Sequence, residues 1–253
     1  MLRALHARLR QKHRTIRYPT PAPALPARVR GRPRLDLDNC KTDCHACAAA
    51  CPTAAINGSG RSLTLDLGRC LFCNACVEAC PSAALQLTTD HVLAGRQRDH
   101  LLQGATPTPA TGPLAKPLLS LFGRSLKLRQ VSAGGCNGCE ADVSVLNTVV
   151  FDLARFGVQF VASPRHADGL LVTGAIPKNM VLALEKTYAA VPTPKVVIAT
   201  GACAISGGPY AGHDEVIGDL SRILPVDLFI PGCPPHPLTT LDGILRLLDR
   251  VHP

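Results

Sequence analysis

Short apolar runs that alternate with helical patterns dominate the C-terminal half of the chain. Amphipathic stretches such as EADVSVLNTVVFDLARF (140–156) and LTTLDGILRLLDRV (238–251) lie between or after these runs. The runs are KLRQVSAG, VQFVAS, DGLLVTG, KVVIAT and VDLFIPG, which begin at positions 127, 158, 168, 195 and 226. Alternating strands and helices favour a doubly wound parallel sheet, so we predict an α/β domain of flavodoxin-like strand order.

The preceding region shows shorter apolar runs and an internal repeat. SLTLDL (62–67) and LQLTT (85–89) are typical of short strands, and CPTAAI is repeated as CPSAAL. This pattern predicts a small α+β domain of pseudo-twofold, ferredoxin-like fold. After it, GATPTPATGPLAKP (104–117) has the composition of a linker. We therefore divide the chain into an arm (1–34), a ferredoxin-like domain (35–90), a linker (91–126) and the α/β domain (127–253).

Charge changes the interpretation of the arm. Of the 27 Lys and Arg residues, ten lie in residues 1–35, which hold none of the 18 acidic residues. Residues 36–253 hold the other 17 basic residues and all 18 acidic residues, so this part of the chain is nearly neutral. Leu2, Leu5, Leu9 and Ile16 recur at helical spacing, which predicts either an interfacial helix that faces anionic lipid or an acidic subunit, or a solvated tail. From Tyr18 onward the arm is proline-rich and predicted to be extended.

Composition also narrows the class of protein. No run of 18 apolar residues is present, so no membrane span is predicted. The start, MLRALHARLRQKHR, lacks the apolar core of a signal peptide, which favours a reducing cytoplasm. Nucleic-acid binding is not expected, because the body is neutral and the chain holds only 6 Phe, 3 Tyr and no Trp.

All twelve cysteines fall into three groups of four. The second group has the C-x2-C-x2-C-x3-C-P spacing of bacterial two-cluster ferredoxins, in which the last cysteine binds the other cluster. The first group repeats this spacing with one extra residue between its first two cysteines. We therefore predict one [4Fe-4S] cluster on Cys40, Cys44, Cys47 and Cys80, and another on Cys51, Cys70, Cys73 and Cys76.

Zinc and disulfides are the competing interpretations of these motifs. Paired zinc knuckles need neither the fourth cysteine nor the proline that follows each run. Disulfides suit small secreted domains rather than a cytoplasmic chain.

The third group is scattered along the α/β domain. Each member follows a predicted strand and has Gly or Pro beside it, and ligands of doubly wound sheets collect outside the carboxyl ends of the strands. Four thiolates from three loops can meet there, so we predict a third [4Fe-4S] cluster on Cys136, Cys139, Cys203 and Cys233.

The motifs GGCNGCE, SPRHADGLLVTGA, GACAISGG and VDLFIPGCPP resemble the small subunit of membrane-bound, complex I-related [NiFe] hydrogenases, the group that includes formate hydrogenlyase and hydrogenase-4. The resembling span runs from about Lys127 to Asp249. The equivalent complex I subunit has two adjacent cysteines in its first cluster loop, whereas Asn137 and Gly138 separate Cys136 from Cys139 here. This difference favours the hydrogenase type.

The N-terminal half resembles the two-cluster ferredoxin subunit of the same complexes, because Tyr18-Pro19 and Arg30-Gly31-Arg32-Pro33 precede the paired cluster motifs. The chain thus looks like a fusion of two neighbouring subunits. The resemblance further implies that Glu140 acts as a proton relay, with an acid in the first turn of a helix, stabilised by the helix macrodipole, as the alternative. Arg165 and His166 are expected either to line the rim near the third cluster or to form an interface or loop-packing pair.

From this resemblance we expect an electron-transfer subunit, not catalytic alone, in a hetero-oligomeric hydrogenase. Its expected partners are a NiFe-type large subunit, a further electron-input subunit and integral membrane subunits, at the cytoplasmic face of the membrane. The alternatives are the same wiring in a nickel-free quinone or sulfur-compound oxidoreductase, or a free polyferredoxin.

Overall fold

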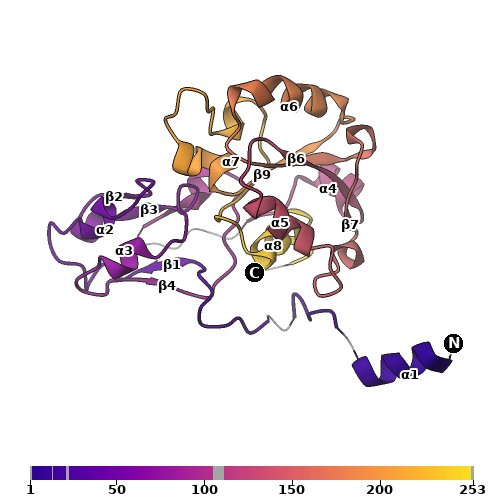
Figure 1. The fold of residues 1–253 in the computed structure, drawn as a ribbon, viewed down its shortest axis with the longest axis horizontal. Helices are drawn as coiled ribbons and strands as arrows, with labels where there is room; N and C mark the ends of the chain where they lie inside the picture. Colours follow the sequence, from indigo (N-terminus) through magenta and orange to yellow (C-terminus); the bar gives the residue numbers. More distant parts are fainter. Residues whose placement is uncertain (1, 13, 21–22, 105–110, 252–253) are drawn as a thin grey trace.

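A computed structural model describes the chain except for residues 1, 13, 21–22, 105–110 and 252–253 (Figure 1). The α-helices are α1 (Leu2–Gln11), α2 (Ala46–Ala49), α3 (Ala75–Glu78), α4 (Lys116–Phe122), α5 (Gly138–Val145), α6 (Lys178–Ala190), α7 (Ala202–Ser206) and α8 (Pro237–Leu247). The strands are β1 (Pro33–Leu35), β2 (Ile56–Asn57), β3 (Thr64–Asp66), β4 (Leu85–Leu87), β5 (Leu102–Gln103), β6 (Leu126–Ser132), β7 (Val158–Phe160), β8 (Gly169–Thr173), β9 (Val196–Thr200) and β10 (Leu228–Ile230). The described residues also form six short 3-10 helices: η1 (Gly60–Ser62), η2 (Arg98–Leu101), η3 (Leu153–Phe156), η4 (Pro164–His166), η5 (Gly208–Tyr210) and η6 (Leu220–Arg222).

The five strands of the C-terminal half form one parallel sheet in the order β10-β9-β8-β6-β7. Counted from β6, this is the flavodoxin-like order 2-1-3-4-5, and the fold prediction is confirmed. Every residue of β8 and β9 is buried, as expected for central parallel strands that helices cover on both faces. The edge strand β10 is buried as well, and Gly95 bridges to its Phe229. The predicted long helix after residue 140 is shorter than expected, because α5 ends at Val145 and η3 follows separately.

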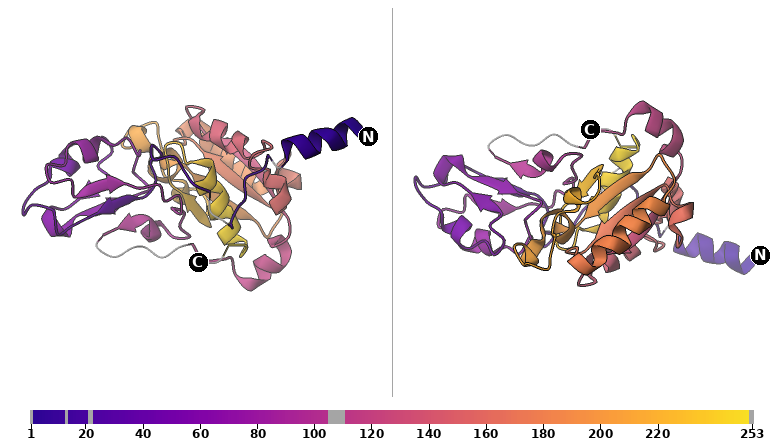
Figure 2. Two further views of the ribbon diagram at one scale, coloured as in Figure 1. Left: turned by 90° about the horizontal axis from the view of Figure 1, so that it is seen from below. Right: turned by 90° about the horizontal axis from the view of Figure 1, so that it is seen from above.

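The ferredoxin-like half is built from two small antiparallel sheets and two one-turn helices. β1 pairs with β4, and β3 pairs with both β2 and β5. The helices α2 and α3 pack against each other and carry cysteines of the first and second motif respectively. In Figures 1 and 2 this half forms a separate lobe beside the parallel sheet.

The segment 91–126 contains structure that its composition did not predict. Its strand β5 extends the ferredoxin-like sheet, Gly95 forms an antiparallel bridge with Phe229 of β10, and Phe122 of α4 is buried. Part of the predicted GATPTPATGPLAKP linker, residues 105–110, lies outside the described residues. The apolar residues Leu93, Leu101 and Phe122 indicate this packing. The Pro, Gly and Thr residues around them instead favoured the prediction of a linker.

One apolar core spans both halves of the molecule. It joins Leu65 and Phe72 of the ferredoxin-like half to Val172, Val197 and other residues on one face of the parallel sheet. A second core fills the other face, beneath α5 and α8. The shared core implies that the two halves hold a fixed relative position.

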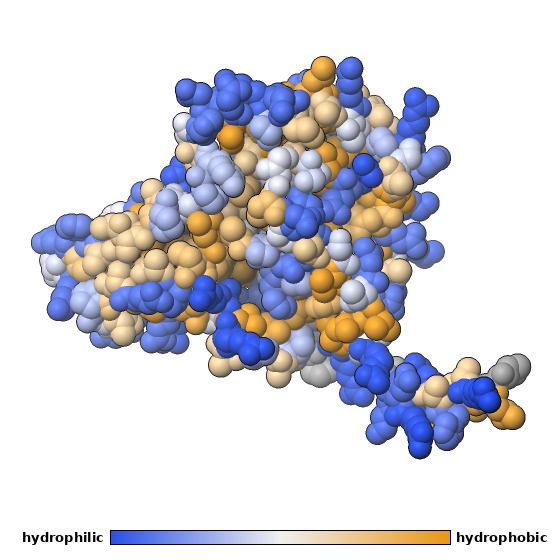
Figure 3. All heavy atoms as spheres, in the orientation of Figure 1, coloured by the Kyte–Doolittle hydropathy of each residue, from blue (hydrophilic) through white to orange (hydrophobic). Residues whose placement is uncertain are grey.

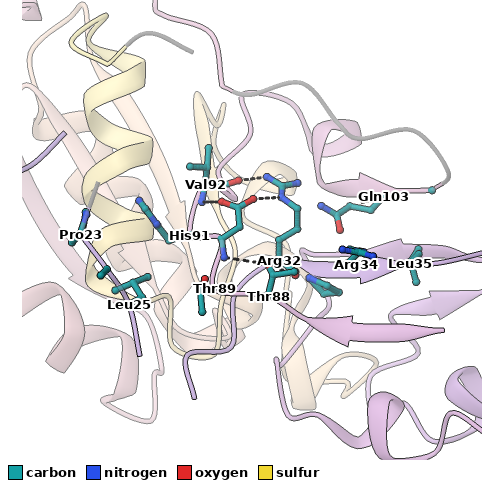
Figure 4. Close-up of a pocket in the computed structure, with 14 residues that line it drawn as sticks. Pro23, Leu25, Arg32, Arg34, Leu35, Thr88, Thr89, His91, Val92 and Gln103 are labelled. Atoms are coloured by element: carbon teal, nitrogen blue, oxygen red, sulfur yellow. Dashed lines mark hydrogen bonds and ion pairs between the residues drawn. The ribbon is translucent and has the colours of Figure 1, made fainter. Parts of the chain in front are cut away.

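The extended arm lies against both halves. At its start the Ile16 amide donates to the carbonyl of Val150, and the Tyr18 hydroxyl donates to Asp242 of α8 at 2.6 Å. Farther along, Arg32 pairs with Asp90 at 2.7 Å and also donates to the Val92 carbonyl (Figure 4). Ile16 is therefore not part of α1, as its spacing suggested, but belongs to this docked segment.

Among the described residues, no helix combines the length and the apolar composition that crossing a bilayer requires.

Candidate metal centres

The first set of cysteines lines one cavity of the ferredoxin-like half. Cys40, Cys44 and Cys47 come from the first motif and Cys80 from the second, and apolar side chains such as Leu37, Leu63 and Leu85 surround them. Burial acts to raise the pKa of Cys80, but hydrogen bonds from Ser82 and from the amides of Ala84 and Leu85 lower that pKa overall.

The second set lines a cavity of similar build. Cys51 comes from the first motif, and Cys70, Cys73 and Cys76 come from the second. The Ala55 amide donates to the Cys51 sulfur at 3.2 Å, and the Phe72 amide donates to the Cys70 sulfur at 3.3 Å. Each cavity thus combines three cysteines of one motif with the last cysteine of the other, which is the arrangement that the crossed assignment predicts.

The third set lies at the carboxyl ends of three parallel strands. Cys136 and Cys139 flank the start of α5 after β6, Cys203 is in α7 after β9, and Cys233 follows β10. Gly201 has φ +91°, and a Cβ placed on it would lie 2.6 Å from the Cys139 sulfur. The backbone therefore approaches this sulfur as closely as only glycine permits.

The electrostatics of the three sets suit a shared metal core. Burial raises the pKa of Cys139 and Cys70 to about 12, and neighbouring cysteines in each set add to both shifts. The pKa of Cys203 is raised to about 11, by burial and then by Cys233 and Cys136. Four sulfurs that repel one another as thiolates need a strongly positive centre to hold them deprotonated. The donor sets therefore fit iron-sulfur clusters, whose iron ions provide that charge.

All twelve cysteines are unbridged. Within the described residues, no three Cys, His, Asp or Glu side chains are close enough to bind a single metal ion.

Gly201→Ala should weaken the third set specifically. The methyl group would meet the Cys139 sulfur, and the backbone conformation costs about 1–3 kcal/mol for a non-glycine residue. We expect a fall of about 2 kcal/mol in unfolding free energy and partial loss of the iron bound there, as measured by denaturation and iron analysis. Gly112→Ala is the matched control, because nothing lies within 4 Å of a Cβ at this position. Equal iron content in both variants would contradict the proposed packing.

Glu140 anchors the first cluster loop of the α/β domain. Its Oε1 accepts hydrogen bonds from Ser132 of β6 at 2.7 Å and from Thr173 of β8 at 2.6 Å. Burial acts to raise the pKa of Glu140, but these hydroxyl donors lower it overall. The carboxylate therefore ties α5 to two strands, and its other oxygen, Oε2, is buried without a partner among the described atoms. The proton-relay role stays a prediction.

The three sets lie in a row. The first and second sets meet where α2 packs against α3, and Cys47 contributes to the raised pKa of Cys76. The second and third sets face one hollow lined by Cys73 and Cys233, and Cys73 contributes to the raised pKa of Cys233.

Arg30 of the arm secures this junction, because its guanidinium donates to the carbonyls of Phe72 and Cys73 at 3.3 and 3.1 Å. The sequence analysis identified the Arg30–Pro33 motif but not this role of Arg30, because the role depends on a contact with Cys73, 43 positions later in the chain.

Arg165 and His166 are not near the third set, so the expectation that they line its rim was wrong. They belong to η4 and share a groove with Lys127, Asp168 and Pro194. These neighbours precede or begin β6, β8 and β9, so the groove lies at the amino ends of the strands, opposite the cysteines. The chain turns back after β7 to enter β8 in parallel, and this crossover carries the pair to the far edge.

Comparison with known proteins agrees with this architecture. Residues 136–247 match the family model "NADH ubiquinone oxidoreductase, 20 Kd subunit", and residues 63–86 match the model "4Fe-4S binding domain". The chain is 41% identical over 134 residues to the probable membrane-bound hydrogenase subunit mbhJ of Pyrococcus furiosus, covering 53% of this chain and 80% of that protein.

Two further relatives each match about half of the chain. Formate hydrogenlyase subunit 7 of Escherichia coli is 44% identical over 52% of this chain, which spans only 51% of that protein. A subunit of the NADH-quinone oxidoreductase of Heliobacterium modesticaldum is 38% identical over 47% of this chain and 69% of its own length. These relatives are subunits of oxidoreductase complexes. The chain belongs to the NADH ubiquinone oxidoreductase 20 Kd subunit family, in the complex I-related branch that includes [NiFe] hydrogenase subunits, and it carries a 4Fe-4S binding segment ahead of the family domain.

Proposed function

We propose that this chain is the electron-relay subunit of a membrane-associated [NiFe] hydrogenase. In this proposal the three cysteine sets hold three [4Fe-4S] clusters, which supply one-electron redox chemistry. The chain connects a redox partner at the ferredoxin-like end to a nickel-iron site in a separate large subunit at the other end. It has no cysteine left for nickel, so the hydrogen chemistry, in either direction, belongs to that partner.

The observation that carries this proposal is the row of sets ending at an exposed edge. Cys73 and Cys233 face the same hollow, and Cys136 is exposed at the carboxyl edge of the sheet. An exposed last set gives a partner protein close access to the end of the relay. The α/β half and its loop-borne set argue against a free polyferredoxin, which does not need them.

A second candidate is the same relay in a nickel-free oxidoreductase that reduces a quinone or a sulfur compound. The 38% identity to a component of an NADH-quinone oxidoreductase supports it. Against it stands the separation of Cys136 from Cys139 by Asn137 and Gly138, the spacing that resembles the hydrogenase type.

Metal analysis of the native complex separates the two candidates. The complex is purified anaerobically from membranes through a tag on this chain. We expect about one nickel per complex and at least the roughly twelve irons that three four-iron clusters contain. Iron at this level without nickel would exclude the hydrogenase and favour the second candidate, whereas far less iron would contradict the relay itself.

A further inference from the structure

Helix α1 projects from the body of the molecule with its side chains exposed or half-buried (Figure 1). None of its residues is buried, and Leu2, Leu5 and Leu9 are 85%, 63% and 71% exposed. Their spacing places them on one side of the helix. In Figures 1 and 2 the helix projects from the body, and Figure 3 shows its apolar and hydrophilic side chains side by side. An exposed leucine stripe of this kind needs a surface to cover it.

Basic side chains flank this stripe on both sides. Helical periodicity places Arg3 and Arg10 on one flank of the leucines and Arg8 on the other. Lys12, Arg14 and Arg17 follow directly, and the first acidic residue of the chain is Asp36. Long basic side chains beside an apolar stripe can extend sideways to charges in the plane at which the stripe is buried. A planar anionic surface offers negative charges to the arginines on both flanks at once. A groove in one acidic protein would pair with both flanks less readily.

The segment that follows the helix is fixed to the body of the molecule. The Ile16 amide donates to the Val150 carbonyl, and Arg155 donates to the Ile16 carbonyl at 2.8 Å. Two residues later Tyr18 is bound to Asp242. Only a few residues therefore separate the helix from a fixed point on the body, so a surface that binds the helix also holds the body close to it.

We propose that α1 is a membrane anchor, which buries Leu2, Leu5 and Leu9 in the headgroup region of an anionic bilayer while its flanking arginines bind lipid phosphates. A ten-residue helix is marginal in water and gains stability when its apolar face is covered. The anchor positions this chain on the membrane whether or not its large subunit contains nickel.

Vesicle flotation of the cluster-loaded full chain tests this anchor. We expect binding to phosphatidylglycerol vesicles, little binding to phosphatidylcholine vesicles, and release by salt. Replacing Leu5 and Leu9 with Glu should abolish binding, whereas Leu182→Glu should not, because Leu182 is equally exposed, at 60%, but lies on α6.

The arginines provide a second arm of the test. Each of Arg3→Gln and Arg10→Gln should weaken binding about fivefold, while Lys186→Gln should leave it unchanged, because Lys186 is an exposed residue of α6. A chain that binds no anionic vesicles, that binds neutral ones equally well, or that binds as tightly after the leucine replacements would overturn the proposal. Retention in the native complex without vesicle binding would assign the helix to an acidic subunit instead.

Discussion

Cys51→Ser should remove the cluster of the second motif, although Cys51 lies in the first. In the structure Cys51 lines the same cavity as Cys70, Cys73 and Cys76, while the cavity of its sequence neighbour Cys47 includes Cys80. A serine hydroxyl is a much poorer ligand than a thiolate for an iron-sulfur core. We expect the iron content of the anaerobically reconstituted chain to fall from about twelve to about eight, with loss of one cluster signal in electron paramagnetic resonance.

Double variants distinguish this crossed assignment from a sequential one. Cys51→Ser with Cys70→Ser should lose no more iron than Cys51→Ser alone, because both residues serve one cluster. Cys51→Ser with Cys40→Ser should lose about four irons more. If instead the first pair loses two clusters and the second pair only one, each motif binds its own cluster, and the crossed assignment is wrong.

The strand signals and the cysteine spacing made much of this architecture predictable. Buried parallel strands leave continuous Val, Ile and Leu runs, as in β8 and β9, and their order followed from the alternation with helices. The gathering of the third set at one edge was predictable as well, since the carboxyl ends of parallel strands share an edge.

Features that depend on contacts between distant parts of the chain, or on the direction of a crossover between strands, were not predictable from local patterns. Arg165 and His166 follow a strand in sequence, but the crossover into β8 places them at the opposite edge from Cys203 and Cys233. The docking of the arm was likewise foreseen only as an extended segment that lies against something. Its contacts join residues more than 200 positions apart, such as Tyr18 and Asp242, and no local propensity specifies them.

These arm contacts link the stability of the molecule to the relative positions of its three cysteine sets. The arm is fixed to α8 at Tyr18, passes the junction at Arg30, and is fixed to the ferredoxin-like half where Arg32 meets Asp90. It thereby crosses both halves on the side where the second and third sets face each other. Release of the arm from α8 should loosen this junction as well as the α/β half.

Asp242→Ala should lower the stability of the molecule strongly. Asp242 is 1% exposed and accepts hydrogen bonds from Tyr18 and, at 2.8 Å, from Arg246, which is 9% exposed. Removing the carboxylate leaves a buried guanidinium charge without its partner, which costs about 3–5 kcal/mol. For a chain of this length we expect the unfolding midpoint to fall by roughly 10 °C, as measured by circular dichroism of the cluster-loaded protein.

Two further variants identify the cause of this loss. Tyr18→Phe keeps the Asp242–Arg246 ion pair and removes one hydrogen bond to a charged group, so it should cost about 1.5–3 kcal/mol and mainly expose the arm to trypsin. Asp242→Ala combined with Arg246→Met removes the unpaired charge and should recover part of the lost stability. If the double variant is no more stable than Asp242→Ala, lost packing rather than the uncompensated charge of Arg246 is responsible for the loss.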